Sequence, residues 1–309
     1  MFEKIPTAEM DRIEWLKLRK TGIGGSDAGA ICGLNPYASP MSVYLDKTRN
    51  DIADEDNESM RQGRDLEDYV ARRFMEETGL KVRRSNMMYR SKEHPCMLAD
   101  LDRLIVGRDA GLECKTASAY NADKWKDGEI PPHYLIQCHH YMAVTGKKSW
   151  YIAVVILGQG FKFAEIPRDD GLINNLICIE ETFWKEHVAQ GIMPDPDGSK
   201  ACDAVLEQYF KVSRKDSTIP LIGFDGKLKR RAELVELIEK LEREQKQIDQ
   251  EIKLYMKENE IAVSDNYRVS WTNVATCRID TKRLKEEHPD IYRGYLNATS
   301  SRRFTVKAA

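Results

Sequence analysis

Two carboxylates and an amine stand at suggestive spacing in the stretch Leu98–Thr116, which reads LADLDRLIVGRDAGLECKT. Apolar runs flank the glycine-bounded turn Gly107–Gly111, so we expect a β-hairpin with Asp102 on its first strand. Glu113 and Lys115 lie two residues apart on the second strand and therefore leave the same face. Because a hairpin can bring Asp102 across to that face, the pattern predicts a hydrolytic site for a hard metal ion, with the lysine positioning or polarising a water.

The spacing alone, D-x(10)-E-x-K, is loose, and its context gives it weight. A carboxylate and a lysine on apolar strands are costly to bury unless they are paired or bound to a metal. The simpler alternative is an ion pair between Glu113 and Lys115 with no catalytic role.

Helices on either side of this stretch could bring further polar groups to it. A helix is expected at about 60–78, closed by Gly79, with Glu67 beside its apolar face. This glutamate either joins the acidic cluster or is simply solvated. A second helix is expected at about 133–145, where Gln137 is the one neutral amide, and the adjacent His139 and His140 are interpreted as packing or surface groups. Strands are expected at 80–90, 148–157 and 161–166, so the fold class is α/β (α+β mixed), with a mixed sheet flanked by helices.

A glycine-rich turn near the N-terminus could hold an anion. A helix at about 8–20 is followed by TGIGGSD, whose glycines allow a ligand to approach the backbone closely. Ser26 or Asp27 can cap the next helix, and a helix N-terminus favours anions. Arg19, seven residues before Ser26, could supply the charge. The alternative is a tight turn with a capped helix and one surface arginine.

Composition limits the class of protein. Apolar residues make up 41% of the 309 residues, enough for a large core, while the net charge of −2 excludes a globally basic nucleic-acid binder. Any contact with DNA must therefore come from local patches or from bound metal ions. The cysteines are odd in number and lack C-x-x-C spacing, which argues for reduced thiols and against a zinc or iron–sulfur site. The polar N-terminus and an eight-residue longest apolar run predict a cytoplasmic protein without a signal peptide or membrane span.

The chain is expected to change character after a turn-rich linker at 193–200. We place a core at 1–198 and a C-terminal extension at 199–309. The extension should contain a helix at about 227–260, a hairpin at 261–275 and a basic tail. The heptad spacing of the helix allows a coiled-coil arm or a helix docked along a neighbour. The tail could be a nucleic-acid face or an ordinary solvated surface.

Taken together, these stretches resemble a known family. Leu98–Thr116 is similar to the PD-(D/E)XK motif of lambda-exonuclease-like, YqaJ-type viral recombinase nucleases, whose core is restriction-endonuclease-like. The resemblance covers roughly residues 12–195. It extends to the stretches WLKLR with Ser26, GRDLE at 63–67, GLECKT at 111–116 and YLIQ at 134–137. Asp102 is followed by arginine where many members have glycine, which leaves Asp100 as an alternative ligand. We choose Asp102 because its apolar neighbours fit the alignment.

The resemblance implies roles for these residues. Arg19 and Ser26 would bind the phosphate at a DNA 5′ end. One or two Mg²⁺ ions, replaceable by Mn²⁺, would bind Asp102, Glu113, the backbone carbonyl of Cys114 and, directly or through water, Glu67. Lys115 would position or help deprotonate the attacking water, and Gln137 would orient the water or the lysine.

The implied activity is that of a phage or prophage exonuclease. Such an enzyme digests the 5′-ended strand of linear double-stranded DNA and leaves a 3′ overhang for recombination. Family members form ring-shaped trimers and work with a single-strand annealing recombinase. Two other hypotheses remain: an endonuclease or Cas4-like nuclease on the same core, and a DNA-binding or assembly module whose nuclease activity is secondary.

Overall fold

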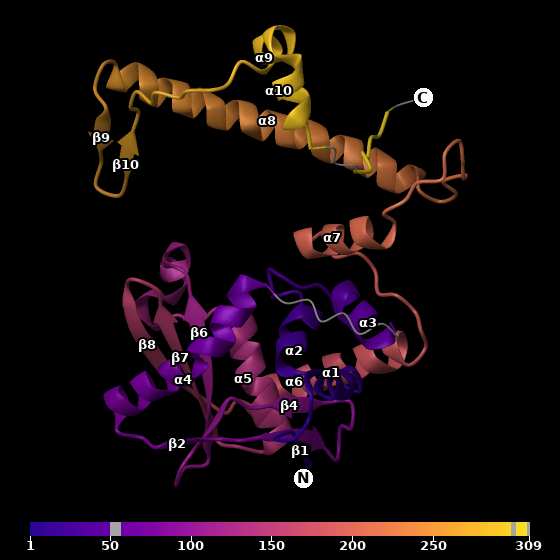
Figure 1. Ribbon diagram of the computed structural model, residues 1–309, viewed down its shortest axis with the longest axis vertical. Coiled ribbons are helices and arrows are strands. Elements are labelled where there is room, and N and C mark those ends of the chain that lie inside the picture. Colours follow the sequence, from indigo (N-terminus) through magenta and orange to yellow (C-terminus); the bar gives the residue numbers. More distant parts are fainter. Residues whose placement is uncertain (50–56, 298–300, 308–309) are drawn as a thin grey trace. The chain divides into compact units, whose positions relative to one another are not determined.

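The structure, a computed structural model, consists of two compact units, Met1–Lys211 and Val212–Ala309 (Figure 1). The residues that it describes are 1–49, 57–297 and 301–307. The division lies after Lys211 rather than after residue 198, where the sequence analysis placed it. The reason is α7 (Lys200–Tyr209), which packs against α3 (Pro40–Thr48) and buries Cys202, so that it belongs to the first unit.

A five-stranded mixed sheet forms the centre of the first unit. Its strands lie in the order β2-β5-β6-β7-β8, and only β6 and β7 run parallel. A parallel pair needs a crossover connection, which here contains α5 (Pro132–Thr145). Helices cover both faces, so the predicted fold class is confirmed. The strands are β2 (Val82–Arg84), β5 (Arg103–Ile105), β6 (Ala110–Ala117), β7 (Ser149–Ile156) and β8 (Gly160–Pro167).

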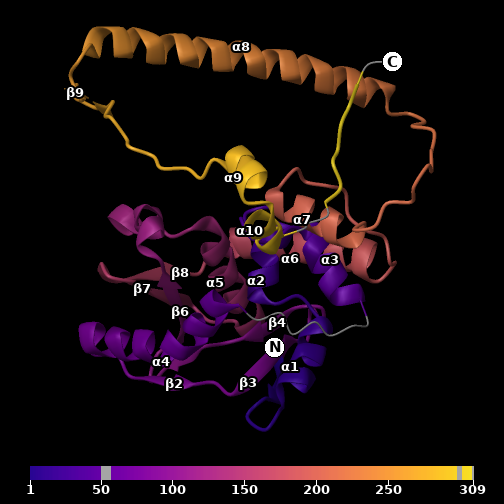
Figure 2. The ribbon, with the colours of Figure 1, turned by 45° about the horizontal axis from the view of Figure 1, so that its top comes forward.

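The core continues on both faces of β7. Trp150 and Ile152 pack in the cluster that contains α5, whereas Tyr151 and Ala153 pack in the cluster that contains α4 (Glu58–Thr78). Figure 2 shows α5 and α4 on either side of this sheet. Because successive side chains of a strand point to opposite faces, a strand buried on both sides reads as one unbroken apolar run.

A second, three-stranded sheet changes the expected hairpin. β1 (Phe2–Pro6), β3 (Met87–Ser91) and β4 (Leu98–Asp100) pair in the order β1-β3-β4. The strand expected at 80–90 is therefore two strands, β2 and β3, separated by Asn86 with a φ of 49°. In the same way the stretch from Leu98 divides into β4 and β5, which belong to different sheets. The prediction that Asp102 lies on a hairpin strand is wrong, because this residue occupies the corner between the two sheets.

The other helices of the first unit begin and end at recognisable signals. Asp11 caps α1 (Arg12–Lys20) by accepting from the backbone N–H of Glu14, so this helix starts later than predicted. α4 and α5 end at glycines with a left-handed conformation. The remaining helical segments are α2 (Gly25–Ile31), η1 (Ala119–Gly128), α6 (Asp170–Phe183) and the π-helical turn η2 (Trp184–Val188) that follows α6.

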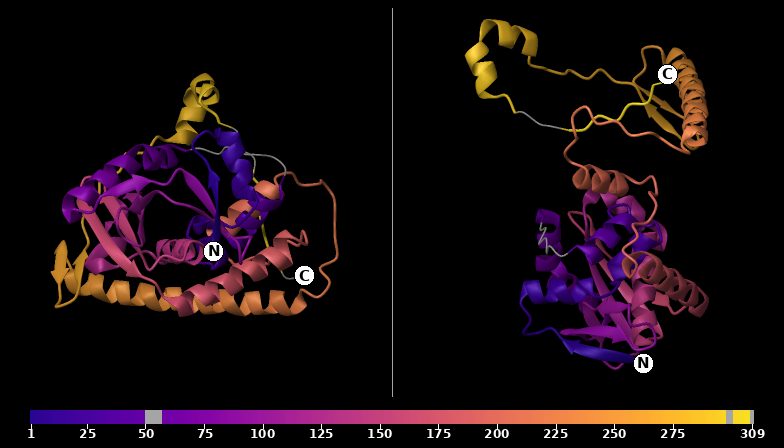
Figure 3. Two further views of the ribbon diagram at one scale, coloured as in Figure 1. Left: turned by 90° about the horizontal axis from the view of Figure 1, so that it is seen from below. Right: turned by 90° about the vertical axis from the view of Figure 1, so that its right-hand side faces the viewer.

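The second unit is built around one long, continuous helix, α8 (Asp225–Met256), which Figure 3 shows as a single rod. The predicted hairpin is present as a short antiparallel pair of strands after α8. The unit also contains two short helices. These elements are β9 (Ile261–Val263), β10 (Arg268–Ser270), α9 (Thr281–Glu287) and α10 (Pro289–Gly294). Within the described residues, none of the helices of either unit has the length and apolarity needed to cross a membrane.

Candidate active site

Glu113 and Lys115 extend from the same face of β6, as their two-residue spacing requires. The lysine Nζ lies 2.5 Å from Glu113 Oε1. Glu113 is buried, and the Lys115 side chain is only 20% exposed. Burial alone favours a neutral amine, but the charges of Glu113 and Asp102 raise the pKa of Lys115 above its ordinary value. The ion pair that the sequence analysis gave as the simple alternative is thus present, together with a second carboxylate.

Asp102 reaches this pair from the corner between the two sheets. Its Oδ2 accepts a hydrogen bond of 2.8 Å from the backbone N–H of Cys114, the residue between Glu113 and Lys115. Burial, and then repulsion from the Glu113 carboxylate, raise the pKa of Asp102 well above its ordinary value. Asp102 can contact β6 in this way because it lies outside β4 and β5, in the corner between the two sheets.

Asp100 is held differently from Asp102. It ends β4, and its Oδ2 accepts a hydrogen bond of 3.0 Å from the indole Nε1 of Trp15 on α1. Both aspartates line the same cavity. Asp102 has the closer connection to β6, because it bonds that strand directly.

Gln137 comes to the acids from α5. Its Nε2 donates to Glu113 Oε1 at 2.7 Å and to the Tyr141 hydroxyl at 2.8 Å. Since a carboxylate only accepts, the amide NH₂ must face Glu113. The start of α2 packs closely here: a Cβ on Gly25 would lie 2.7 Å from the Tyr141 ring and 2.9 Å from Gln137. Glycine at this position lets α2 approach the amide.

Glu67 is engaged by a residue that the sequence analysis did not single out. Arg103 of β5 is buried and forms an ion pair with Glu67 of α4. Its two terminal nitrogens also donate to the Asp102 carbonyl and to Asp68 Oδ1, each at 2.6 Å. A buried arginine needs acidic partners. An arginine inside an apolar strand, with Glu67 and Asp68 on the preceding helix, was the signal that could have revealed this contact.

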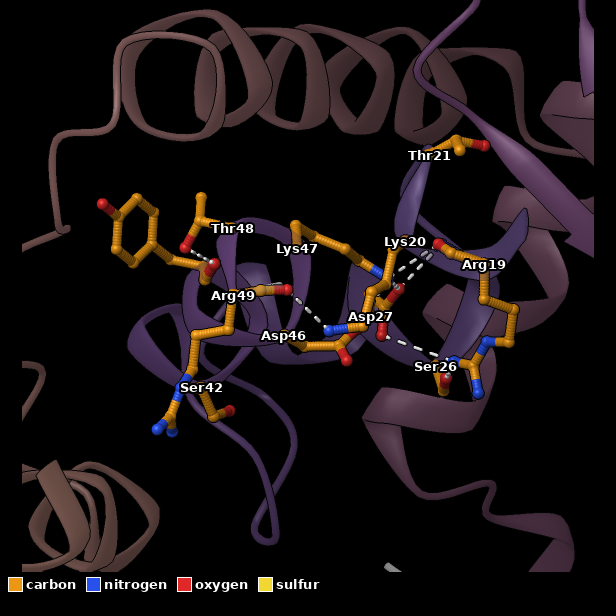
Figure 4. Close-up of polar contacts among 12 residues, drawn as sticks. Arg19, Lys20, Thr21, Ser26, Asp27, Ser42, Asp46, Lys47, Thr48 and Arg49 are labelled. Atoms are coloured by element: carbon orange, nitrogen blue, oxygen red, sulfur yellow. Dashed lines mark hydrogen bonds and ion pairs between the residues drawn. The ribbon is translucent and has the colours of Figure 1, made fainter. Parts of the chain in front are cut away.

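Arg19 and Ser26 contact one another, and both line the cavity that Asp100 and Asp102 also line. Arg19 Nη2 donates to Ser26 Oγ at 3.3 Å (Figure 4). The guanidinium carbon also lies 5.0 Å from the centre of the Trp15 ring, a cation–π contact that helps to orient it. Trp15 therefore touches both Arg19 and Asp100, although the sequence analysis used it only as part of a longer motif.

One cavity of about 170 Å³ joins these two groups of residues. Five of the predicted site residues line it: an arginine, a serine, two acids and an amide. Lys115, Cys114 and Glu67 are not among the residues that line it. The predicted residues in the wall are Arg19, Ser26, Asp102, Glu113 and Gln137, and they are joined there by Trp15, Asp100 and Tyr141.

Comparison with known proteins places the chain in a family. The family described as the YqaJ-like viral recombinase domain matches residues 14–148. The protein named YqaJ of Bacillus subtilis (strain 168) is 40% identical over 304 residues, which cover 97% of this chain and 95% of that protein. The chain belongs to the YqaJ-like family. The family resemblance found in the sequence is therefore confirmed.

Solved structures share the fold of this YqaJ-like protein. The alkaline exonuclease LHK-Exo of Laribacter hongkongensis, crystallised with dAMP, matches with a TM-score of 0.50 and 20% identity, covering 65% of this chain and 99% of that one. A second crystal structure of the same enzyme gives a TM-score of 0.49 with the same identity and coverage. At this identity the likeness shows the fold alone.

The acids of the YqaJ-like site fit a small, hard cation. Within the described residues, no three His, Cys, Asp or Glu side chains are grouped closely enough to hold a metal by themselves. Asp102 and Glu113 supply two carboxylates, however, and Glu113 Oε2 is buried without a hydrogen-bond partner among those residues. Mg²⁺ commonly takes one or two protein carboxylates and completes its shell with water and substrate phosphate. Two carboxylates with an unused buried oxygen match that requirement.

A buried histidine fixes α5, the helix that carries Gln137. His140 Nε2 lies 2.7 Å from the Leu98 carbonyl of β4, and Nδ1 lies 2.8 Å from Glu180 Oε1 of α6. The carbonyl can only accept, so Nε2 donates, and an ionised Glu180 makes Nδ1 a donor as well, which corresponds to an imidazolium ring. Burial alone lowers the pKa of His140, but Glu180 and Leu98 outweigh it and the net shift is upward.

We expect His140→Gln to lower the free energy of unfolding by about 3 kcal/mol near pH 6, because it breaks a buried ion pair. Because the pKa of His140 is raised in the folded state, its protonation stabilises the folded protein. This stabilisation is complete below the ordinary histidine pKa of 6.5 and is lost as the pH rises through the higher pKa of the folded state. The difference between variant and wild type should therefore shrink from pH 6.5 to pH 9. Urea unfolding followed by circular dichroism measures it at each pH.

The neighbouring His139 provides the control. Its Nδ1 has no hydrogen-bond partner among the described residues, and burial lowers its pKa. Any pH dependence introduced by His139→Gln should therefore lie below pH 6.5. If the cost of His140→Gln stayed constant from pH 6 to pH 9, the imidazolium assignment would be wrong.

Proposed function

We propose that this YqaJ-like protein is a metal-dependent DNA nuclease, a 5′-to-3′ exonuclease on linear double-stranded DNA that leaves 3′ overhangs for phage-type recombination. The observation that carries the proposal is the cavity whose wall contains both the Arg19–Ser26 pair and the carboxylates of Asp102 and Glu113. The viral recombinase family and a fold shared with an alkaline exonuclease support the same reaction class.

The basic side of the cavity suits a terminal phosphate. The planar guanidinium of Arg19 can donate two parallel hydrogen bonds to phosphate oxygens. The Ser26 hydroxyl, already 3.3 Å from that guanidinium, can donate a third. A strand whose 5′ phosphate is bound here extends its next phosphodiester toward the acids within the same cavity. Cutting therefore starts from an end.

The acidic side carries the hydrolysis. Asp102, Glu113 and the Cys114 carbonyl would hold Mg²⁺, with Glu67 helping directly or through water, and Mn²⁺ should substitute. When bound, the metal supplies Lewis acidity at the scissile phosphate. Lys115, 2.5 Å from Glu113, is placed to hold the attacking water, while Gln137 keeps the Glu113 carboxylate oriented. Arg103 fixes the corner that carries Asp102 through the carbonyl of that residue.

Comparison of three DNA substrates tests the proposal. With Mg²⁺, the wild type should degrade linear duplex with 5′-phosphoryl ends, act more slowly on 5′-hydroxyl ends and leave covalently closed circles intact. Arg19→Ala should remove the preference for phosphoryl ends, about 10- to 100-fold, because charge-assisted hydrogen bonds contribute roughly 1.5–3 kcal/mol. End-labelled duplexes on denaturing gels report both polarity and rate.

The circular substrate decides between modes of cutting. Equal cleavage of circles and linear duplex would indicate an endonuclease on the same core and reject the exonuclease proposal. Binding of DNA ends with no cleavage in Mg²⁺ or Mn²⁺ would instead favour an assembly module.

We further propose that the enzyme acts as a homotrimer in the cytoplasm of a bacterial host, together with a single-strand annealing recombinase that receives the 3′ overhang. A ring around the duplex would keep the enzyme on its substrate between cuts. Light scattering of the full chain measures the oligomer, and a monomeric mass during processive digestion would contradict the trimer.

A further inference from the structure

Lys47 of α3 is a buried lysine next to the proposed phosphate pocket. Its side chain is fully buried, and Nζ lies 2.7 Å from Asp27 Oδ2. Nζ also donates to the carbonyl of Arg19 at 3.1 Å and lies 3.1 Å from Oδ2 of the half-exposed Asp46 (Figure 4). This one ammonium thus connects α3 to the end of α1 and the start of α2.

Asp27 links that lysine to the pocket. Its Oδ1 lies 3.7 Å from Arg19 Nη2, the same nitrogen that donates to Ser26. Its Oδ2 accepts from the backbone N–H of Gly24 at 2.9 Å, which fixes the turn before Ser26. The aspartate therefore positions both the guanidinium and the hydroxyl that face the cavity.

This arrangement places a carboxylate beside a group that should bind phosphate. A like charge close to a bound anion weakens binding, and weak solvent screening inside the protein enlarges the effect. Burial tends to raise the pKa of Asp27, but Lys47 and Arg19 hold it below its ordinary value, so the carboxylate is charged. Without Lys47, the negative charge of Asp27 would offset the positive charge of the Arg19 guanidinium.

We propose that Lys47 is a positioning residue that determines specificity for 5′-phosphoryl ends: it neutralises Asp27 and fixes the backbone at Arg19, so that the arginine charge remains available to the terminal phosphate. This inference rests on the proposed function. It assigns the preference for phosphate to a buried ion pair that does not touch the DNA, in addition to the two side chains that do.

Binding without turnover tests the role. A fluorescently labelled duplex with 5′-phosphoryl or 5′-hydroxyl ends is titrated with full-length protein in EDTA, and anisotropy gives the ratio of the two dissociation constants. The wild type should favour phosphoryl ends. Lys47→Met should reduce that ratio about tenfold or more, since it leaves a charge without its partner.

The double variant Lys47→Met/Asp27→Asn separates electrostatics from packing. Asparagine retains an oxygen for the Gly24 N–H but carries no charge. Most of the lost phosphate preference should therefore return, whereas a purely structural lysine would leave the double variant as poor as the single one. Lys20→Met is the matched control, because Lys20 is a nearby lysine that donates to the Arg49 carbonyl.

The outcomes are distinguishable. A wild type that binds both ends equally would reject the phosphate pocket itself, and the inference with it. A wild-type preference that survives Lys47→Met would reject the inference alone. The inference would also be rejected if Lys47→Met lost the preference and the added Asp27→Asn failed to restore it, with circular dichroism confirming that both variants are folded.

Discussion

Lys115→Ala is expected to lower the rate of duplex cleavage in Mg²⁺ by about three orders of magnitude, within the range that a positioned proton donor or acceptor contributes. The amine lies among the two carboxylates of the site, and its removal leaves Glu113 Oε1 with only the Gln137 amide. Single-turnover digestion of an end-labelled duplex measures the chemical step without product release. Binding of 5′-phosphoryl ends should change little, because the proposed phosphate ligands are Arg19 and Ser26, and Lys115 is not among the residues that line the cavity with them.

Two variants control this experiment. Lys148→Met removes an exposed lysine just before β7, outside the cavity wall, and should leave cleavage unchanged. Lys115→Met retains the apolar stem but removes the ammonium, which lies 4.6 Å from the centre of the Tyr134 ring, and should be as inactive as the alanine variant. If Lys115→Ala cleaved at the wild-type rate, the hydrolytic centre would have to be sought elsewhere.

The helices and strands of this fold were predictable where the apolar residues of the sequence follow one clear periodicity. The strand that carries Glu113 and Lys115 follows the two-residue period, and β7 follows the apolar run expected of a strand buried on both faces. α5 is bounded by Pro132 and Gly146, and α4 ends at Gly79. Turn and cap residues act locally, so sequence is sufficient to place them.

The corner between the sheets was not predictable in this way. Strand pairing across long sequence separations divides 80–90 and 98–105 into strands of two sheets, and no local signal states which partner a short apolar run will take. The position of Asp102 depends on that division. The relative position of Asp102 and Glu113 therefore could not be derived from a hairpin, although the prediction that the two residues lie close together agrees with the cavity that both line.

Buried ion pairs were the other feature that sequence alone did not reveal. Arg103 and Lys47 each appear as ordinary charged residues, one in a strand and one in a helix, yet both side chains are buried against acids from other elements. Such pairs depend on the tertiary arrangement of the helices. The same pairs hold the corner that carries Asp102 and the turn that precedes Ser26, so the residues that support the site could be identified only from the structure.

The choice between Asp100 and Asp102 leads to a prediction of comparable size to that for Lys115. We expect Asp102→Asn to lower cleavage by about three orders of magnitude, because it removes a charge from the pair that would hold the metal, and each 1.36 kcal/mol changes the rate tenfold. Asp100→Asn should cost only about tenfold. Both changes are nearly isosteric, and in each variant the amide oxygen can still accept the original bond, from Cys114 N–H or from Trp15 Nε1.

Metal affinity separates this prediction from a general loss of fold. Calorimetric titration with Mn²⁺ should show binding to wild type and to Asp100→Asn, and much weaker binding to Asp102→Asn. The reverse order, in both calorimetry and cleavage, would make Asp100 the ligand and reduce Asp102 to a cap on the Cys114 N–H. The corner geometry favours the first outcome, because Asp102 bonds directly to the strand that carries Glu113. The Asp102 carboxylate is also buried beside the Glu113 carboxylate, and the two repel one another.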